Sequence, residues 1–288
     1  MKPAPFAYHV PRTVDEAIEM LADHEGDAAP LAGGQSLIPM MNMRAATPAQ
    51  VVDLNRLPGL DRIADDGRSL SIGALVRHRN LENLTGGDPT SRLLASAARC
   101  VGSPAIRTRG TFVGSLAHAD PAAEWCAVAV LLDGRVTLRS SEGARELPVA
   151  EFLVGPFQTQ RAHIELVVGA VLRKLPSQHS VAFVEETRTG GDLPIACAGV
   201  SLLIIDGTIR EAHIAVGGVG ATAFRAVRSE NALGAVDVRD GRAILSAAAL
   251  VSDDGDPVPA PFASPDYRRH LGRVVVERAI YRAIGRRP

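Results

Sequence analysis

Two glycine-containing segments hold the residue types that bind phosphate. The first is residues 31–37, with the sequence LAGGQSL. Glycine lets the backbone approach a ligand closely and adopt positive φ, so successive N–H groups can converge on an anionic oxygen, and Ser36 adds a hydroxyl. An ordinary tight turn uses the same residue types. The segment is therefore a candidate phosphate loop, with a simple turn as the alternative.

The second segment is residues 109–124, with the sequence RGTFVGSLAHADPAAE. It places Thr, Gly and Ser in a compact loop, followed by the acids Asp120 and Glu124. Carboxylates accept hydrogen bonds from ribose hydroxyls in dinucleotide sites. Neither segment matches G-x-G-x-x-G or the Walker motif, which argues against the common NAD and ATP sites. A pyrophosphate held between two separate loops stays possible.

Two side chains of the second segment have competing interpretations. His118 either donates to phosphate or has a purely structural role. Asp120 precedes Pro121, and this pair is favourable at the N-cap and first position of a helix. Asp120 therefore either caps a helix that begins at Pro121 or takes part in the site.

The first loop must be positioned by a small α+β unit. Thr13 precedes apolar residues at helical spacing, which predicts a helix from about Val14. Short strands are expected at residues 30–32 and 50–54. The second loop lies among a strand at 69–74, a helix around 91–101, and strands at 135–139 and 165–172.

The sequence pattern in the last third of the chain predicts a sheet with helices. Residues 176–180 are expected to form a linker, because proline and small polar residues interrupt the apolar pattern. Strands at 199–205 and 213–219 should pair around an Asp206–Gly207 turn, with a bend at the glycines of 217–220. Residues 267–284 suit a closing helix.

Composition excludes several classes of protein. Hydrophobic residues make up 46% of the 288 residues and charged residues 22%, as in folded globular proteins. Basic residues (31) nearly balance acidic ones (32), which argues against a nucleic-acid partner. No apolar run is long enough for a membrane span, and we expect a cytoplasmic protein.

Metal centres are not indicated. The three cysteines, Cys100, Cys126 and Cys197, are far apart, unlike disulfide frameworks or the ligands of zinc and iron–sulfur sites. The eight histidines show no HxH or HExxH spacing. We expect free buried thiols and no metal site in this chain.

Five ordered motifs together resemble the FAD-binding medium subunit of the xanthine dehydrogenase and carbon monoxide dehydrogenase family. They are residues 32–44 (AGGQSLIPMMNMR), 106–124 (beginning IRTRGT and ending DPAAE), 185–192 (EETRTGGD), 217–222 (GGVGAT) and 267–274 (YRRHLGRV). The resemblance covers nearly the whole chain.

The resemblance implies an α+β fold. A two-lobed FAD-binding domain of the PCMH/vanillyl-alcohol-oxidase type would span residues 1–57 and 58–176. A C-terminal domain with a three-stranded antiparallel sheet and helices would span 177–288.

The resemblance also implies which residues bind FAD. The two loops would wrap the pyrophosphate, the acid at Glu124 would lie by the nucleotide, and Val101 would lie near the flavin. With the candidates from the second segment, the expected cofactor-binding residues are Ala32, Gly33, Gly34, Gln35, Ser36, Leu37, Val101, Thr111, Gly114, Ser115, His118, Asp120 and Glu124. No residue is expected to be catalytic.

Three positions depart from the family pattern. Val113 stands where a glycine is usual, Glu124 replaces Asp while keeping the charge, and Leu193 replaces a frequent aromatic residue. The flavin's exposure and potential are expected to differ accordingly.

The implied function is electron transfer in a molybdenum hydroxylase. A large molybdopterin subunit would hydroxylate the substrate, a small subunit would relay electrons through two [2Fe-2S] clusters, and FAD in this chain would pass them to an external acceptor. The complex would be a dimer of heterotrimers. Two alternatives are a self-contained FAD-dependent oxidoreductase with its own small substrate and an assembly module that has lost its flavin.

Overall fold

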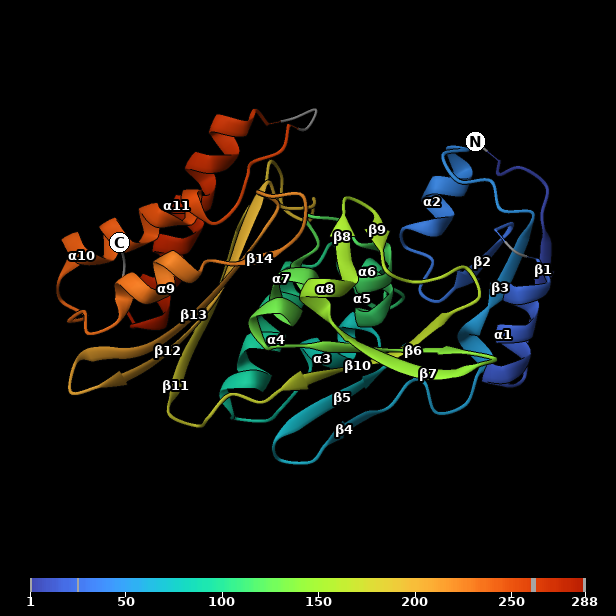
Figure 1. Cartoon of the computed structure of the whole chain (residues 1–288), viewed down its shortest axis with the longest axis horizontal. Coiled ribbons are helices and arrows are strands. Elements are labelled where there is room, and N and C mark those ends of the chain that lie inside the picture. The colour runs from blue at the N-terminus through green and yellow to red at the C-terminus, as the bar shows by residue number, and fades with distance from the viewer. Residues whose placement is uncertain (1, 25, 260–262, 287–288) are drawn as a thin grey trace.

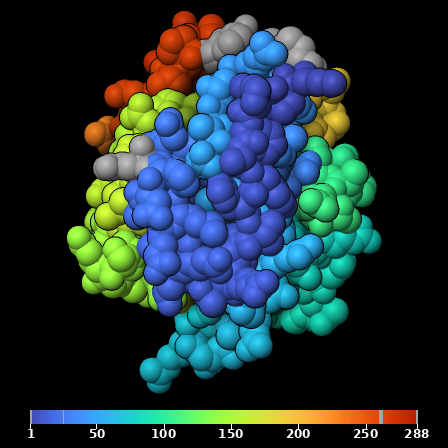
Figure 2. All heavy atoms as spheres, turned by 90° about the vertical axis from the view of Figure 1, so that its right-hand side faces the viewer, coloured from blue at the N-terminus to red at the C-terminus, as the bar shows by residue number. Residues whose placement is uncertain are grey.

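The computed structural model describes residues 2–24, 26–259 and 263–286. Three sheets follow one another along the longest axis of the molecule, from the N-terminal elements at the right of Figure 1 to the C-terminal helices at the left. Figure 2 looks at the N-terminal side, where the first unit covers the centre of the face. The chain therefore adopts a mixed helix and strand architecture in which distinct sheets lie side by side.

The N-terminal sheet is parallel, with the order β1–β3–β2. Helix α1 begins where its cap predicts, since the Thr13 side chain accepts a hydrogen bond from the Glu16 backbone N–H at 3.1 Å. The elements of this unit are β1 (Ala7–His9), α1 (Val14–Asp23), β2 (Ala28–Leu31), α2 (Leu37–Asn42), β3 (Gln50–Asp53) and η1 (Leu54–Arg56). The first glycine loop is the link from β2 to α2.

The middle sheet is antiparallel, with the order β4–β5–β10–β6–β7. Its strands are β4 (Ile63–Asp65), β5 (Ser69–Gly73), β6 (Arg135–Ser140), β7 (Gly143–Pro148) and β10 (Leu166–Arg173). Its helices are α3 (His78–Glu82), α4 (Pro89–Cys100), α5 (Pro104–Arg107), α6 (Phe112–His118), α7 (Glu124–Leu131) and α8 (Val149–Phe152). A small hairpin, β8 (Leu153–Gly155) with β9 (Gln158–Thr159), follows α8. The second glycine loop leads into α6.

The C-terminal sheet contains the three long antiparallel strands expected and a short fourth, in the order β11–β12–β13–β14. At the turn between β12 and β13, Asp206 and Gly207 have φ of 50° and 74°, as a tight hairpin requires. The elements are β11 (His179–Glu186), β12 (Ala196–Ile205), β13 (Thr208–Gly217), β14 (Phe224–Arg225), α9 (Val227–Leu233), α10 (Gly241–Ala249), η2 (Leu250–Asp253) and α11 (Pro265–Ala283).

One local prediction is wrong, and one of the two interpretations of Asp120 is excluded. The expected linker at 176–180 ends early, because His179 already pairs with Leu203 in the sheet and its buried ring shares a hydrogen bond with Ser201. No helix begins at Pro121. Helix α7 begins at Glu124, and the Asp120 carboxylate instead accepts from the Ala122 backbone N–H at 2.9 Å.

Helix α7 is the buried centre of the molecule. All eight of its residues are buried, because the middle unit lies on one side and strands β12 and β13 lie on another. Its Trp125 is fully buried and packs edge-on against Phe112 of α6, with ring centroids 5.1 Å apart. The start of α7 is thereby held beside the second glycine loop.

Neither a membrane span nor a metal site is found in the described part of the chain. No helix among those residues is long and apolar enough to cross a bilayer. The same residues contain no group of three His, Cys, Asp or Glu side chains that could hold a metal ion.

Removing the cap of helix α4 should destabilise the protein. The Asp88 carboxylate accepts from the backbone N–H groups of Thr90 and Ser91, so Asp88→Ala should lower the free energy of unfolding by about 1 kcal/mol. Denaturant unfolding measures the change. Glu19→Ala, at an exposed position of α1, is the matched control and should have little effect. Equal stability of the two variants would contradict the capping role.

Candidate functional site

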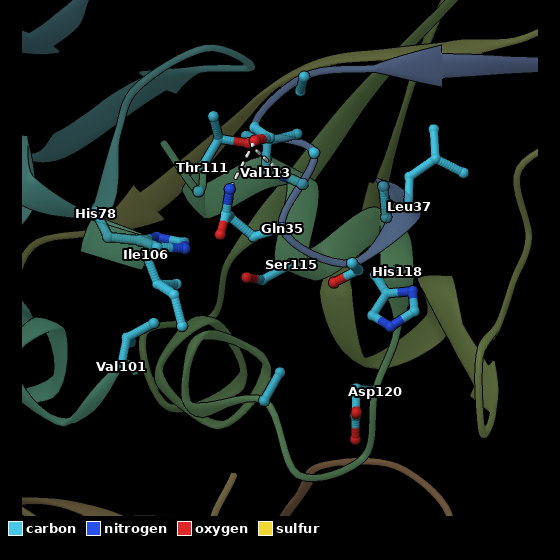
Figure 3. Close-up of a pocket in the computed structure, with 18 of the residues that line it drawn as sticks. Gln35, Leu37, His78, Val101, Ile106, Thr111, Val113, Ser115, His118 and Asp120 are labelled. Carbon is cyan, nitrogen blue, oxygen red and sulfur yellow. Dashed lines mark hydrogen bonds between the residues drawn. The ribbon is translucent and has the colours of Figure 1, made fainter. Parts of the chain in front are cut away.

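One cavity of about 590 Å³ collects the predicted site residues. Figure 3 shows its lining, which comes from the loop before α2, the segment from Val101 through α6 to Glu124, and other parts of the chain. All thirteen residues expected from the sequence line it: Ala32, Gly33, Gly34, Gln35, Ser36, Leu37, Val101, Thr111, Gly114, Ser115, His118, Asp120 and Glu124. The two glycine loops therefore belong to a single site.

The two loops touch through their backbones. A Cβ atom added to Gly33 would lie 2.4 Å from the Arg109 carbonyl oxygen and 2.6 Å from the Gly110 Cα. No side chain fits in that space, so glycine is required at this position. The next residue, Gly34, has φ of +71°, which L side chains rarely adopt. These two glycines give the first loop its course.

Polar side chains outside the loops hold the two together. Asn55 Nδ2 donates to the Ala32 carbonyl at 2.9 Å, and its Oδ1 accepts from the Arg77 guanidinium at 2.6 Å. The same guanidinium donates to the Arg109 carbonyl. Asp53 accepts from the Asn55 backbone N–H at 3.0 Å and from the Tyr8 hydroxyl. This network fixes the separation of the loops.

Backbone donors of the first loop are left available to a ligand. Among the described residues, none accepts a hydrogen bond from the N–H groups of residues 33–36. In the second loop the Thr111 hydroxyl accepts from Gly114 N–H at 3.1 Å, which caps α6. Convergent N–H groups of this kind bind anionic oxygens. The site is thus suited to phosphate groups.

Burial changes the protonation of the acid Glu124 in the cavity and of its neighbour Glu185. Glu124 is only 3% exposed, and burial raises its pKa to about 8, with Glu185 and Asp120 adding repulsion. Burial likewise raises the pKa of neighbouring Glu185 to about 7. The sequence presents Glu124 as a charged acid, whereas desolvation outweighs its hydrogen bonding and shifts it toward the neutral form. In neutral form its carboxyl can donate as well as accept.

Arg161 supplies positive charge to the cavity. Its Nη1 donates to the Ala162 and Glu165 carbonyls at 3.0 and 2.9 Å, which orders the loop before β10. His118, by contrast, has its pKa lowered by burial, so its neutral form is favoured. Among the described lining residues, Arg161 is the only Lys or Arg.

Sequence reasoning did not assign several lining residues to the site. His78 comes from a segment without a recognisable motif, Ile106 begins the second motif but was not assigned to the site, and Arg161 lies in a polar loop. Asp192 ends the 185–192 motif and Leu193 was itself one of the three departures from the family pattern, but neither was among the expected cofactor-binding residues. They belong to the β11–β12 loop, which brings the C-terminal unit to the cavity.

The comparisons decide the family. A family model described as the FAD binding domain in molybdopterin dehydrogenase matches residues 4–172, and a model of the CO dehydrogenase flavoprotein C-terminal domain matches residues 181–283. The chain belongs to the FAD-binding medium subunits of the molybdenum hydroxylase family. The resemblance seen in the five motifs and the α+β fold it implied are confirmed.

Similar proteins cover the whole length of this medium subunit. The 6-hydroxypseudooxynicotine dehydrogenase complex subunit alpha of Paenarthrobacter nicotinovorans is 40% identical, over 99% of this chain and 97% of its own. The nicotine 6-hydroxylase medium subunit of the same organism is 32% identical, over 98% and 99%. A chain of the carbon monoxide dehydrogenase structure from Hydrogenophaga pseudoflava superposes with a TM-score of 0.93 at 31% identity, covering 100% of both chains.

Enlarging Gly33 should impair cofactor binding by the medium subunit. The new methyl group of Gly33→Ala would overlap the Arg109 carbonyl and force the loops apart, so FAD affinity should fall at least roughly tenfold. Calorimetric titration of the apoprotein measures this. Gly87→Ala is the control, because a Cβ there meets nothing within 4 Å. An unchanged affinity of the Gly33 variant would show that the loops do not bind the cofactor together.

Neutralising Glu124 should change how the stability of the medium subunit depends on pH. Because the folded-state pKa is about 8 and the ordinary value is 4.5, the stability contributed by the protonated carboxyl is full below about pH 4.5 and is lost as pH rises to about 8. Glu124→Gln avoids that loss.

The variant should therefore gain stability over the wild-type apoprotein between these pH values, with the largest gain at about pH 8. Denaturant unfolding at several pH values measures the difference. The stability of the control variant Glu19→Gln, changed at an exposed position, should depend on pH in the same way as that of the wild type. Parallel curves for Glu124→Gln would refute the neutral buried acid.

Proposed function

We propose that this chain binds FAD in the described cavity and accepts electrons there from [2Fe-2S] clusters of a partner subunit, passing them to an external acceptor. The observation that carries the proposal is the backbone contact of Gly33 with the second loop, which makes one site of two donor-rich segments. Membership of the flavoprotein family identifies the cofactor.

The residues present fit FAD. Both loops offer N–H groups and hydroxyls to the pyrophosphate. The positive charge of Arg161 offsets part of the negative charge of the pyrophosphate. Val101 and Ile106 provide an apolar surface for the flavin. Arg107 donates to the Gly102 carbonyl at 2.9 Å and thereby holds Val101 in place. A volume of about 590 Å³ lies within the range of cofactor pockets.

The protein's part in the reaction is binding and tuning. FAD supplies the exchange of electrons, and this chain orients it and limits water at the flavin. The neutral Glu124 and the buried His78 place polar groups without full charge in the cavity. No side chain of this chain is assigned a bond-making role in the proposal.

Partner subunits carry the other centres in this proposal. All three cysteines are free, two of them fully buried, and burial raises the pKa of Cys100 to about 12. Such thiols are poor iron ligands, because ligation requires the thiolate. A small subunit with two [2Fe-2S] clusters and a large molybdopterin subunit would complete a heterotrimer, paired as a dimer in the cytoplasm.

We also propose the division 1–57, 58–176 and 177–288 for the three units. Each of the three sheets lies within one of these ranges, and each range contributes most members of a separate hydrophobic cluster. Phe183 and Cys197 pack into the middle cluster, which joins the third unit to the second.

Absorption spectra with metal analysis test the electron-transfer proposal. The chain purified alone should show flavin bands without iron or molybdenum, and the sample co-expressed with its neighbouring subunits should contain all three. Anaerobic addition of substrate to the complex should then bleach the flavin bands. A colourless chain that takes up no FAD would reject the assignment. Bleaching of the chain alone by a small substrate would favour the self-contained oxidoreductase.

A further inference from the structure

His78 lines the cavity and belongs to none of the five sequence motifs. It opens helix α3, and its backbone N–H donates to the Gly110 carbonyl at 3.0 Å, beside the second loop. Its side chain is 3% exposed and lines the cavity. A Cβ added to Gly110 would lie 2.4 Å from His78 Nε2, so the ring packs directly against this loop.

Trp125 determines which ring nitrogen of His78 carries the proton. Its indole Nε1 donates to His78 Nδ1 at 2.9 Å, and both side chains are buried. An indole N–H can only donate, so Nδ1 must be an unprotonated acceptor. The neutral ring then carries its proton on Nε2. Burial, together with Arg77 and Arg107, lowers the pKa of His78 to about 4, so the ring stays neutral at physiological pH.

The remaining donor is available to a ligand. Among the described residues, no acceptor is bonded to His78 Nε2. Figure 3 shows the ring directed into the cavity, with Ile106 and Val101 on the same side of it. A donor beside an apolar surface matches a flavin, which combines a flat apolar ring with carbonyl and nitrogen acceptors.

We propose that Trp125 holds His78 as a neutral Nε2–H donor and that this donor binds an acceptor in the flavin half of FAD. The inference rests on the proposed site of FAD binding and adds a cofactor-binding residue, His78, and a positioning residue, Trp125. Because the donor is uncharged, it orients the flavin without adding positive charge at the ring.

Nitrogen-15 NMR of the histidine-labelled apoprotein tests the tautomer and the ligand together. His78 should show the neutral Nε2–H pattern from about pH 5.5 to pH 9. Addition of FMN, which has only the flavin half, should shift the Nε2–H resonance, and addition of ADP should not. A shift with ADP alone, or with neither ligand, would overturn the inference.

Affinity measurements give an independent readout. Calorimetric titration measures the affinities of FAD, FMN and ADP in each variant. His78→Phe should weaken FAD and FMN roughly tenfold and leave ADP unchanged, and His78→Gln, which keeps an N–H donor, should recover part of the loss. Equal weakening of FMN by His78→Gln and His78→Phe would overturn the donor role.

The Trp125→Phe variant distinguishes the role of Trp125 from that of His78. It keeps an aromatic ring but removes the indole donor, so the NMR pattern of His78 should become a mixture of tautomers, and calorimetry should show an intermediate FMN affinity. An unchanged pattern would overturn the role of Trp125. Failure of the wild-type chain itself to bind FAD would instead reject the proposed function and this inference with it.

Discussion

The contact between two backbones, at Gly33 and at Arg109–Gly110, is the constraint on which the site depends. It joins the parallel N-terminal sheet to the antiparallel middle sheet beside the first loop, where the N–H groups of residues 33–36 have no acceptor among the described residues. No side chain fits between the loops there, so hydrogen bonds from side chains outside the loops fix the distance between them. The Arg77 guanidinium bonds both Asn55 of the first unit and the second loop, and a flat group with several fixed donors suits such a bridge.

Burial controls the charges of the cavity as strongly as residue type does. Burial raises the pKa of Glu124 and of Glu185 and lowers the pKa of His78, so each is shifted toward its neutral form, although the sequence presents them as ordinary titratable side chains. The cause is helix α7 and its neighbours, which remove water from one wall of the cavity. A site built in this way offers backbone dipoles and Arg161 on one side, while burial shifts the acid and the histidine on the other wall toward their neutral forms.

The sequence predicted what local chemistry determines. Glycine loops, the Thr13 cap and the Asp206–Gly207 turn have signals within a few residues, and the structure has each of these features. The possible helix start at Asp120–Pro121 does not occur. Helix α7 begins three residues after Pro121, where its residues pack in the core, so packing outweighs the local capping preference. His78 went unassigned because its partner Trp125 is 47 residues away, a distance at which no spacing rule applies.

The third unit contributes to a cavity that is lined mainly by the first two. Its β11–β12 loop brings Asp192 and Leu193 to the cavity, and Leu193 is 56% exposed there. All three units therefore contribute residues to the lining of the cavity. A ligand that binds only this arrangement stabilises it in proportion to the logarithm of its concentration relative to Kd. In the proposed site, FAD would therefore contact all three units and favour their assembled arrangement.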